Sequence, residues 1–168
     1  MAKKNPTPEQ QLGEFIDKFE APMASFIRAA RRRMRALLPR ASELVYDNYN
    51  FFVIAYAPSE RASQAILSLA AHARGLTLFF LHGKELADPH RLLLGGGKQV
   101  RSVKLESMAT LRRPEVLALI RQACSKARIP LSDSPPRQLL IKSVSAKQRP
   151  RRVPFARSKG ASKATRRS

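Results

Sequence analysis

Apolar positions in the first forty residues follow the period of an α-helix. The first group recurs at i, i+3, i+4 and i+7 and consists of Leu12, Phe15, Ile16 and Phe19. Pro8 and Glu9 suit a first helical turn, because proline lacks only a donor that is unpaired there and a carboxylate complements the helix dipole. The same period resumes at Met23, after Pro22, and stops at Pro39. The pattern therefore predicts two consecutive N-terminal helices.

From Leu44 onward, short runs rich in Val, Ile, Phe, Tyr and Leu alternate with turn residues, as is typical of strands. The predicted strands are 44–47, 51–57, 65–71, 76–82 and 100–105. Most links between them are too short for crossover helices, which favours antiparallel pairing. A last helix is predicted from Pro114 to Ala127. The expected fold is α+β, an antiparallel sheet of about five strands packed against two N-terminal helices and one C-terminal helix.

The ends of the chain differ in composition from its middle. We expect a flexible N-terminus over 1–8, a folded domain over 9–131 and a disordered basic tail over 132–168. Beyond residue 132 the sequence is mostly Pro, Ser, Lys, Arg and Ala, and its one apolar patch, 139–141, is too short to offset the entropy of ordering.

Charge is distributed unevenly along the 168 residues, which contain 32 Lys and Arg against 12 Asp and Glu. All 12 carboxylates lie between Glu9 and Asp133, so residues 137–168 carry +11 with no acid to neutralise it. Such a field attracts polyanions, whether nucleic acid, acidic proteins or an anionic membrane.

Two groups of basic residues are candidate nucleic-acid contacts. One is a helical stripe of Arg28, Arg31, Arg32 and Arg35. The other is the tail set of Lys147, Arg149, Arg151, Arg152, Arg157, Lys159, Lys163, Arg166 and Arg167. Phosphate contacts from these residues would release counterions and bind DNA or RNA without reading sequence. The alternatives are a solvated arginine face and a tail that only keeps the chain in solution.

A single cysteine, Cys124, cannot form an internal disulfide, and no apolar signal segment or membrane span is recognisable. We therefore expect a cytoplasmic protein. Cys124 lies on the apolar side of a predicted helix, and no nucleophile elbow or acid–base pair of carboxylates is present, so we expect a non-enzymatic protein without a cofactor. His82, Asp88 and His90 lack a metal-binding spacing, so no metal site is predicted.

Several motifs resemble the YdhG-like family of small bacterial domains of uncharacterised function. They are Leu44-Val45-Tyr46-Asp47-Asn48-Tyr49, Leu78-Phe79-Phe80, Asp88-Pro89, Leu93, Gly95, Gly97-Lys98 and Arg101. The resemblance covers about residues 12–127 and implies an α+β fold with an antiparallel sheet packed on helices, but no reaction. One branch is described as a frataxin-like iron chaperone. Labile iron needs an oxygen-rich cluster, but here Glu85, Asp88 and Glu106 are scattered among basic residues. We therefore expect this chain to share the fold of the family and not the iron binding of that branch.

Two segments are candidate sites for a small ligand or an anion. Tyr46, Tyr49 and Tyr56 lie near one predicted hairpin, where they either form a pocket or cap the sheet with their hydroxyls in water. The second candidate set is Asp88, Gly95, Gly97, Lys98 and Arg101. Its glycines either cradle an anion or simply permit positive φ in a flexible turn, and the segment lacks the first glycine and the Ser or Thr of a Walker A loop.

Two functional hypotheses follow from the sequence. The first is a YdhG-like binding or accessory domain whose basic tail contacts nucleic acid nonspecifically, so that removing 137–168 abolishes binding and leaves the fold intact. The alternative is a small-ligand or iron-chaperone-type domain that uses the 46–56 hairpin and the 88–101 loop.

Overall fold

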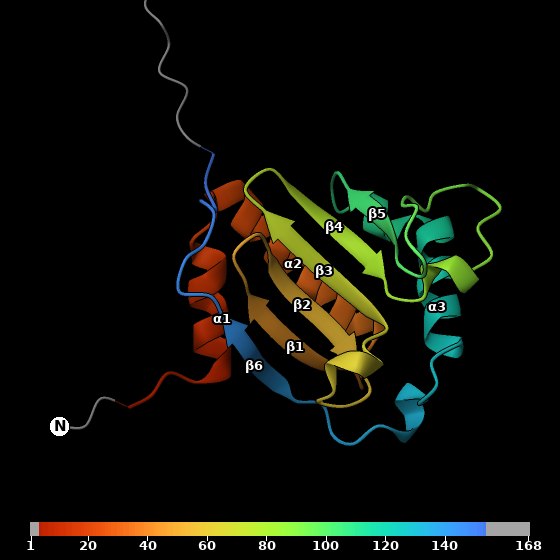
Figure 1. The fold of residues 1–168 in the computed structure, drawn as a ribbon, viewed down its shortest axis with the longest axis horizontal. Coiled ribbons are helices and arrows are strands. Elements are labelled where there is room, and N and C mark those ends of the chain that lie inside the picture. Colours follow the sequence, from red (N-terminus) through yellow and green to blue (C-terminus); the bar gives the residue numbers. More distant parts are fainter. Residues whose placement is uncertain (1–3, 154–168) are drawn as a thin grey trace, which may run out of the picture.

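The computed structural model describes residues 4–153, which form three α-helices and one sheet (Figure 1). The helices are α1 (Pro8–Asp17), α2 (Ala21–Leu37) and α3 (Pro114–Ser125). A capping box starts α1: the Thr7 hydroxyl accepts from the backbone N–H of Gln10, and the Gln10 side chain accepts from the backbone N–H of Thr7. All three helices have proline in their first turn, where its missing donor costs nothing.

Six strands make one mixed sheet in the spatial order β5-β4-β3-β2-β1-β6. They are β1 (Ser42–Asp47), β2 (Phe52–Ala57), β3 (Leu67–His72), β4 (Gly75–Phe80), β5 (Arg101–Leu105) and β6 (Leu139–Val144). Strands β1 to β5 pair antiparallel with their neighbours in chain order. Strand β6 pairs parallel with β1 and has a bulge opposite Val45 and Tyr46. The first and last strands of the chain therefore lie side by side.

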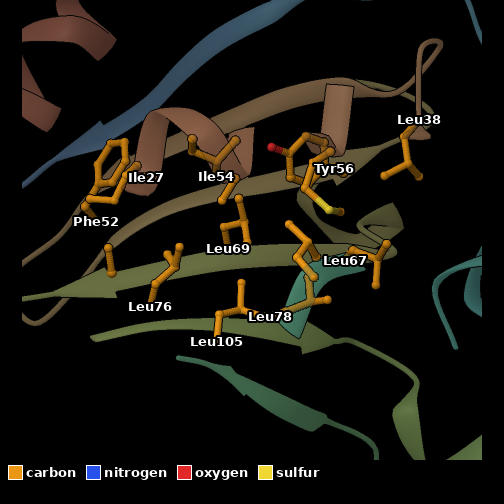
Figure 2. Packing of buried hydrophobic residues seen from close by; sticks show 14 of the residues in the cluster. Ile27, Leu38, Phe52, Ile54, Tyr56, Leu67, Leu69, Leu76, Leu78 and Leu105 are labelled. Carbon is orange, nitrogen blue, oxygen red and sulfur yellow. The ribbon is translucent and has the colours of Figure 1, made fainter. Parts of the chain in front are cut away.

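The main core lies between one face of the sheet and the helices. Alternate residues of each strand point into it, and Figure 2 shows Phe52, Ile54 and Tyr56 of β2 facing Ile27 and Leu38. All five of these side chains are at most 1% exposed. The apolar stripe recognised in the sequence of α1 is the face that it buries in this core.

The predicted α+β class and its three helices are confirmed. The predicted antiparallel sheet of about five strands is confirmed for β1 to β5, and β6 adds a sixth strand that the prediction missed and that pairs parallel with β1. The segment predicted as 65–71 forms a strand only from Leu67, since a short 3-10 turn (Ala62–Gln64) leads into it.

The prediction of a disordered tail from residue 132 is wrong over residues 132–153. A 3-10 turn (Leu131–Asp133) leads into β6, where Leu139 and Ile141 pack against the main core. The apolar patch 139–141 is too short to fold by itself. In the structure it hydrogen-bonds to the edge of β1 and packs on the core that the other strands and the helices form. Residues 154–168 lie outside the described residues.

Candidate nucleic-acid interface

The four candidate arginines of α2 do not form one exposed stripe. Arg31 is buried, and its guanidinium joins α1 to β1 by donating to Glu9 (Nη2–Oε2, 2.9 Å) and to Glu43 (Nε–Oε2, 2.9 Å). Burial disfavours its charge, but the hydrogen bonds that Arg31 donates to Glu9 and Glu43 outweigh burial and raise the pKa of Arg31. The prediction that Arg31 contacts nucleic acid is therefore wrong, because the residue neutralises a buried carboxylate.

The other three arginines of this stripe line a shallow hollow of about 260 Å³ between α1 and α2. Arg28 donates to Asp17 at 2.6 Å, and Arg35 approaches Glu43 at 3.7 Å. Arg32 is exposed and has no carboxylate within 4.0 Å among residues 4–153. Within the stripe, Arg32 is thus the residue best placed to meet a polyanion.

The C-terminal candidates also divide between structural and exposed positions. Arg151 is buried: it donates to the Asp47 carboxylate (Nη2–Oδ1, 2.9 Å) and to the backbone carbonyls of Asn48 and Asn50. Its assignment as a nucleic-acid contact is therefore wrong. Asp47 is itself fully buried and also accepts from Lys18 Nζ at 2.6 Å. A buried carboxylate needs such partners. The Arg151–Asp47 ion pair therefore holds the C-terminal segment against β1, and the Lys18–Asp47 ion pair joins the end of α1 to the same carboxylate.

Three further C-terminal candidates lie on the surface. Lys147 and Arg149 are exposed, and the Arg149 guanidinium lies 5.7 Å from the ring centre of Tyr49. Arg152 reaches Glu20 at 3.7 Å and donates to the backbone carbonyl of Lys18. The remaining candidates lie outside the described residues and are Arg157, Lys159, Lys163, Arg166 and Arg167.

The three candidate tyrosines do not share a pocket. Tyr56 is fully buried in the main core (Figure 2), where burial and then the nearby Glu43 carboxylate raise its pKa well above the ordinary value. Tyr46 lies on the opposite face of the sheet, and Tyr49 is 50% exposed in the turn that follows β1. The hairpin pocket is contradicted because successive strand residues alternate between faces.

Side chains of the 88–101 segment hydrogen-bond mainly to the backbone of the same segment. The Asp88 carboxylate accepts from the backbone N–H groups of Leu92 and Leu93, and Arg101 donates to the carbonyls of Gly97 and Val100. Gly95 has φ +117°, which favours the flexible-turn interpretation of this glycine. Lys98 is exposed on the same turn. Strand β5 follows this segment and lies four places from β1 in the sheet, so the predicted two-part site of hairpin and loop does not come together.

A different surface hollow, of about 450 Å³, opens beside the C-terminal end of α3. Its lining combines apolar residues, among them Ile66 and Phe80, with the charged residues Glu85, Lys126 and Arg128. Lys126 Nζ donates to the backbone carbonyl of Glu85 at 2.9 Å. No local motif marks this hollow in the sequence, because the residues that form it are spread from Pro58 to Ile129.

Within residues 4–153, no group of three or more His, Cys, Asp and Glu side chains could hold a metal ion. Burial raises the pKa of Cys124 to about 11, which leaves its thiol protonated at neutral pH. No helix in this part of the chain is long and apolar enough to cross a bilayer.

Comparison of the chain with family models, with curated proteins and with solved structures gives no match. The resemblance to the YdhG-like family therefore stays a prediction.

Unpaired positive charge is the property that most clearly distinguishes this surface. Residues 4–153 contain 26 Lys and Arg against 12 Asp and Glu, a net charge of +14. Only seven of these cations lie within 4.0 Å of a carboxylate in this range: Lys18, Arg28, Arg31, Arg35, Arg113, Arg151 and Arg152. The excess charge thus belongs to the folded domain as well as to the C-terminal segment.

Proposed function

We propose that the protein is a non-enzymatic nucleic-acid-binding module, formed by a YdhG-like domain and a basic C-terminal segment that act together. The observation that carries this proposal is the net charge of +14 on residues 4–153, most of it on side chains that no carboxylate of that range neutralises. Each phosphate that such a surface contacts releases counterions, which favours binding to any nucleic-acid sequence.

The test is fluorescence anisotropy of labelled DNA and RNA with the full chain and with residues 1–153, over a salt series. A cut at residue 153 keeps β6 and Arg151, whereas the cut at residue 136 suggested by sequence alone would remove both. We expect both proteins to bind, the full chain more tightly, because 154–168 contains five further cations. Affinity is expected to fall steeply with salt. The logarithm of the association constant should decrease with the logarithm of the salt concentration by about 0.7–0.9 for each phosphate contacted.

A matched pair of variants separates contact from structure. Arg32→Met removes an exposed cation of α2. We expect it to weaken binding and to reduce the slope of log affinity against log salt by about one, the value for one phosphate contact. Ala36→Gln, at an exposed position of α2 that does not line the hollow, changes no charge and should leave binding as it is. The proposal is rejected if the full chain binds neither DNA nor RNA at low salt.

A second candidate function, small-ligand binding, rests on the hollow beside α3. Its apolar lining suits the body of a small ligand, and Lys126 and Arg128 outnumber the one acid, Glu85, which favours an anionic group on that ligand. A ligand that binds the folded state raises the melting temperature by mass action. A thermal-shift screen of aromatic and aliphatic carboxylates and phosphates tests this candidate, and a hit should be lost in Arg128→Met.

A further inference from the structure

One face of the sheet is not covered by any α-helix of residues 4–153, although Ala65 and Leu81 pack over Leu44 at one end of it. Figure 1 shows α2 running behind the strands, while the front of β1 to β4 lies open. The pairing register identifies which residues point there, because paired residues share a face and their neighbours point the other way. One row across the sheet is Tyr46, Val53, Ala70, Thr77 and Lys104, and the next is Leu140, Leu44, Ala55, Ser68, Phe79 and Ser102.

This open face has a floor of small side chains with aromatic rings around it. Ala55, Ser68 and Ala70 form the floor on β2 and β3. Tyr46 on β1 and Phe79 on β4 stand on either side and are half-buried. At the end of the face, Phe51 is 42% exposed and its ring lies edge-on to His72, with 5.9 Å between centroids. The three floor residues are at most 8% exposed, so a flat ligand on this face would stack on the surrounding rings.

The charge on this face is exclusively positive along the strands. Glu43 and Asp47 are the only carboxylates on the six strands, and both point toward the helices, since they pair with the core residues Tyr56 and Phe52. Lys104 is exposed at the β5 side of the open face. On the β6 side Lys142 is exposed, with its Nζ donating only to the backbone carbonyl of Glu60 in this part of the structure.

The basic C-terminal segment starts at the same end of the sheet as Phe51. Arg151 donates to the carbonyls of Asn48 and Asn50 in the β1–β2 turn, and Arg149 lies over Tyr49 in that turn. Arg152 then contacts Lys18 and Glu20, so the chain leaves the described structure beside α1 at this end of the sheet. Residues 154–168 add five cations and no acid.

From these observations we propose that the open face binds single-stranded nucleic acid, with bases stacked on Tyr46, Phe51 and Phe79 and phosphates near Lys104 and Lys142. This inference rests on the proposed function and names its ligand class. Unpaired bases can turn their rings onto an aromatic sheet, whereas the bases of a duplex are already stacked on each other. The positive edges suit a phosphate backbone that crosses the strands.

The test compares a labelled oligo(dT) of about 12 nucleotides, within the range that such surfaces cover, with a duplex of the same length. The full-length variants are Tyr46→Thr, Phe51→Thr and Phe79→Thr, in which threonine suits a strand but cannot stack. Val144→Thr is the control, because Val144 is 52% exposed and pairs with Asp47, whose side chain points toward the helices and away from the open face. Thermal melts check that each variant is folded.

We expect the single strand to bind the native chain more tightly than the duplex does. Each aromatic substitution should weaken single-strand binding about tenfold, in line with the loss of one stacked base, and should leave duplex binding unchanged. Val144→Thr should leave both affinities unchanged. The inference is overturned if folded variants bind oligo(dT) as tightly as the native chain does, or if their affinities for single strand and duplex fall equally. The proposed function stands in both cases. Efficient competition by poly-glutamate would also overturn the inference. Failure to bind any nucleic acid rejects both.

Discussion

At the residue scale, both carboxylates of β1 are buried and each is neutralised by an arginine from outside the strand. Glu43 accepts from Arg31 of α2, and Asp47 accepts from Arg151 near the end of the described chain. A buried carboxylate without its partner is costly, so these two arginines have structural roles even though they belong to a very basic chain. Their neighbours Arg32 and Arg152 are exposed.

Arg31 and Arg32 are adjacent in α2 but should respond in opposite ways to the same substitution. Arg31→Met leaves Glu43 buried with only Arg35 at 3.7 Å, and we expect the free energy of unfolding to fall by about 3–5 kcal/mol. Arg32→Met should change it by less than about 0.5 kcal/mol. Urea denaturation followed by circular dichroism measures both, and equal stabilities would contradict the structural role of Arg31.

Cys124 supplies a second prediction at this scale. Because burial raises its pKa to about 11, roughly one thiol in a thousand is ionised at pH 8, against about one in four for an ordinary cysteine. Its reaction with an aromatic disulfide reagent should be about a hundredfold slower than that of the urea-unfolded chain, and should quicken about tenfold per pH unit between about pH 7 and 9. A plateau below pH 9 would show that the thiol is more acidic than the structure implies.

At the scale of elements, β6 and the segment after it decide how the sheet ends. Strand β6 covers the edge of β1, and the Glu43 N–H donates to the Gln138 carbonyl where the two strands begin to pair. The segment then returns over α1: Gln148 donates to the carbonyl of Asp47, and Arg151 reaches the Asp47 carboxylate. An exposed edge strand would otherwise be open to pairing with other chains.

Truncation separates this structural segment from the residues beyond it. At high salt, where charge repulsion is screened, residues 1–153 should unfold at the same urea concentration as the full chain. Residues 1–136 should lose about 3–5 kcal/mol or fail to fold, because Asp47 loses Arg151 and β1 loses its partner. Arg151→Met in the full chain removes the ion pair to Asp47 but keeps β6, so the free energy of unfolding should fall by less than in residues 1–136. Equal unfolding midpoints for 1–136 and 1–153 would refute the role of β6.

At the scale of the whole molecule, the dominant property is a net charge of +20, of which +14 belongs to residues 4–153. Charge of one sign repels itself in the compact state and is screened by salt. The core must therefore stabilise the fold against this repulsion.

We expect the melting temperature of the full chain to rise as sodium chloride increases from about 50 to 500 mM, since the Debye length falls well below 10 Å in that range. Residues 1–153 should show a smaller rise, because they lack five of the cations. A melting temperature that falls with salt would indicate that exposed ion pairs contribute more than the self-repulsion does.

The sequence by itself determined the local elements of this protein and its overall charge. The helical period of Leu12 to Phe19, the prolines that open three helices and the alternating strands are local properties that hold in almost any tertiary setting. Net charge is likewise a sum over residues, independent of the fold. The class and the three helices could therefore be predicted from the chain alone.

Only the tertiary structure decided which residues of each kind are available for function. Whether 139–141 is a strand depends on the free edge of β1, nearly a hundred residues away, and whether Arg31 or Arg151 faces solvent depends on where Glu43 and Asp47 are buried. The open face is also a tertiary property: Tyr46, Phe51 and Phe79 share it through strand register, while Tyr56 points into the core. Burial and long-range pairing select among identical side chains, and no local pattern carries that information.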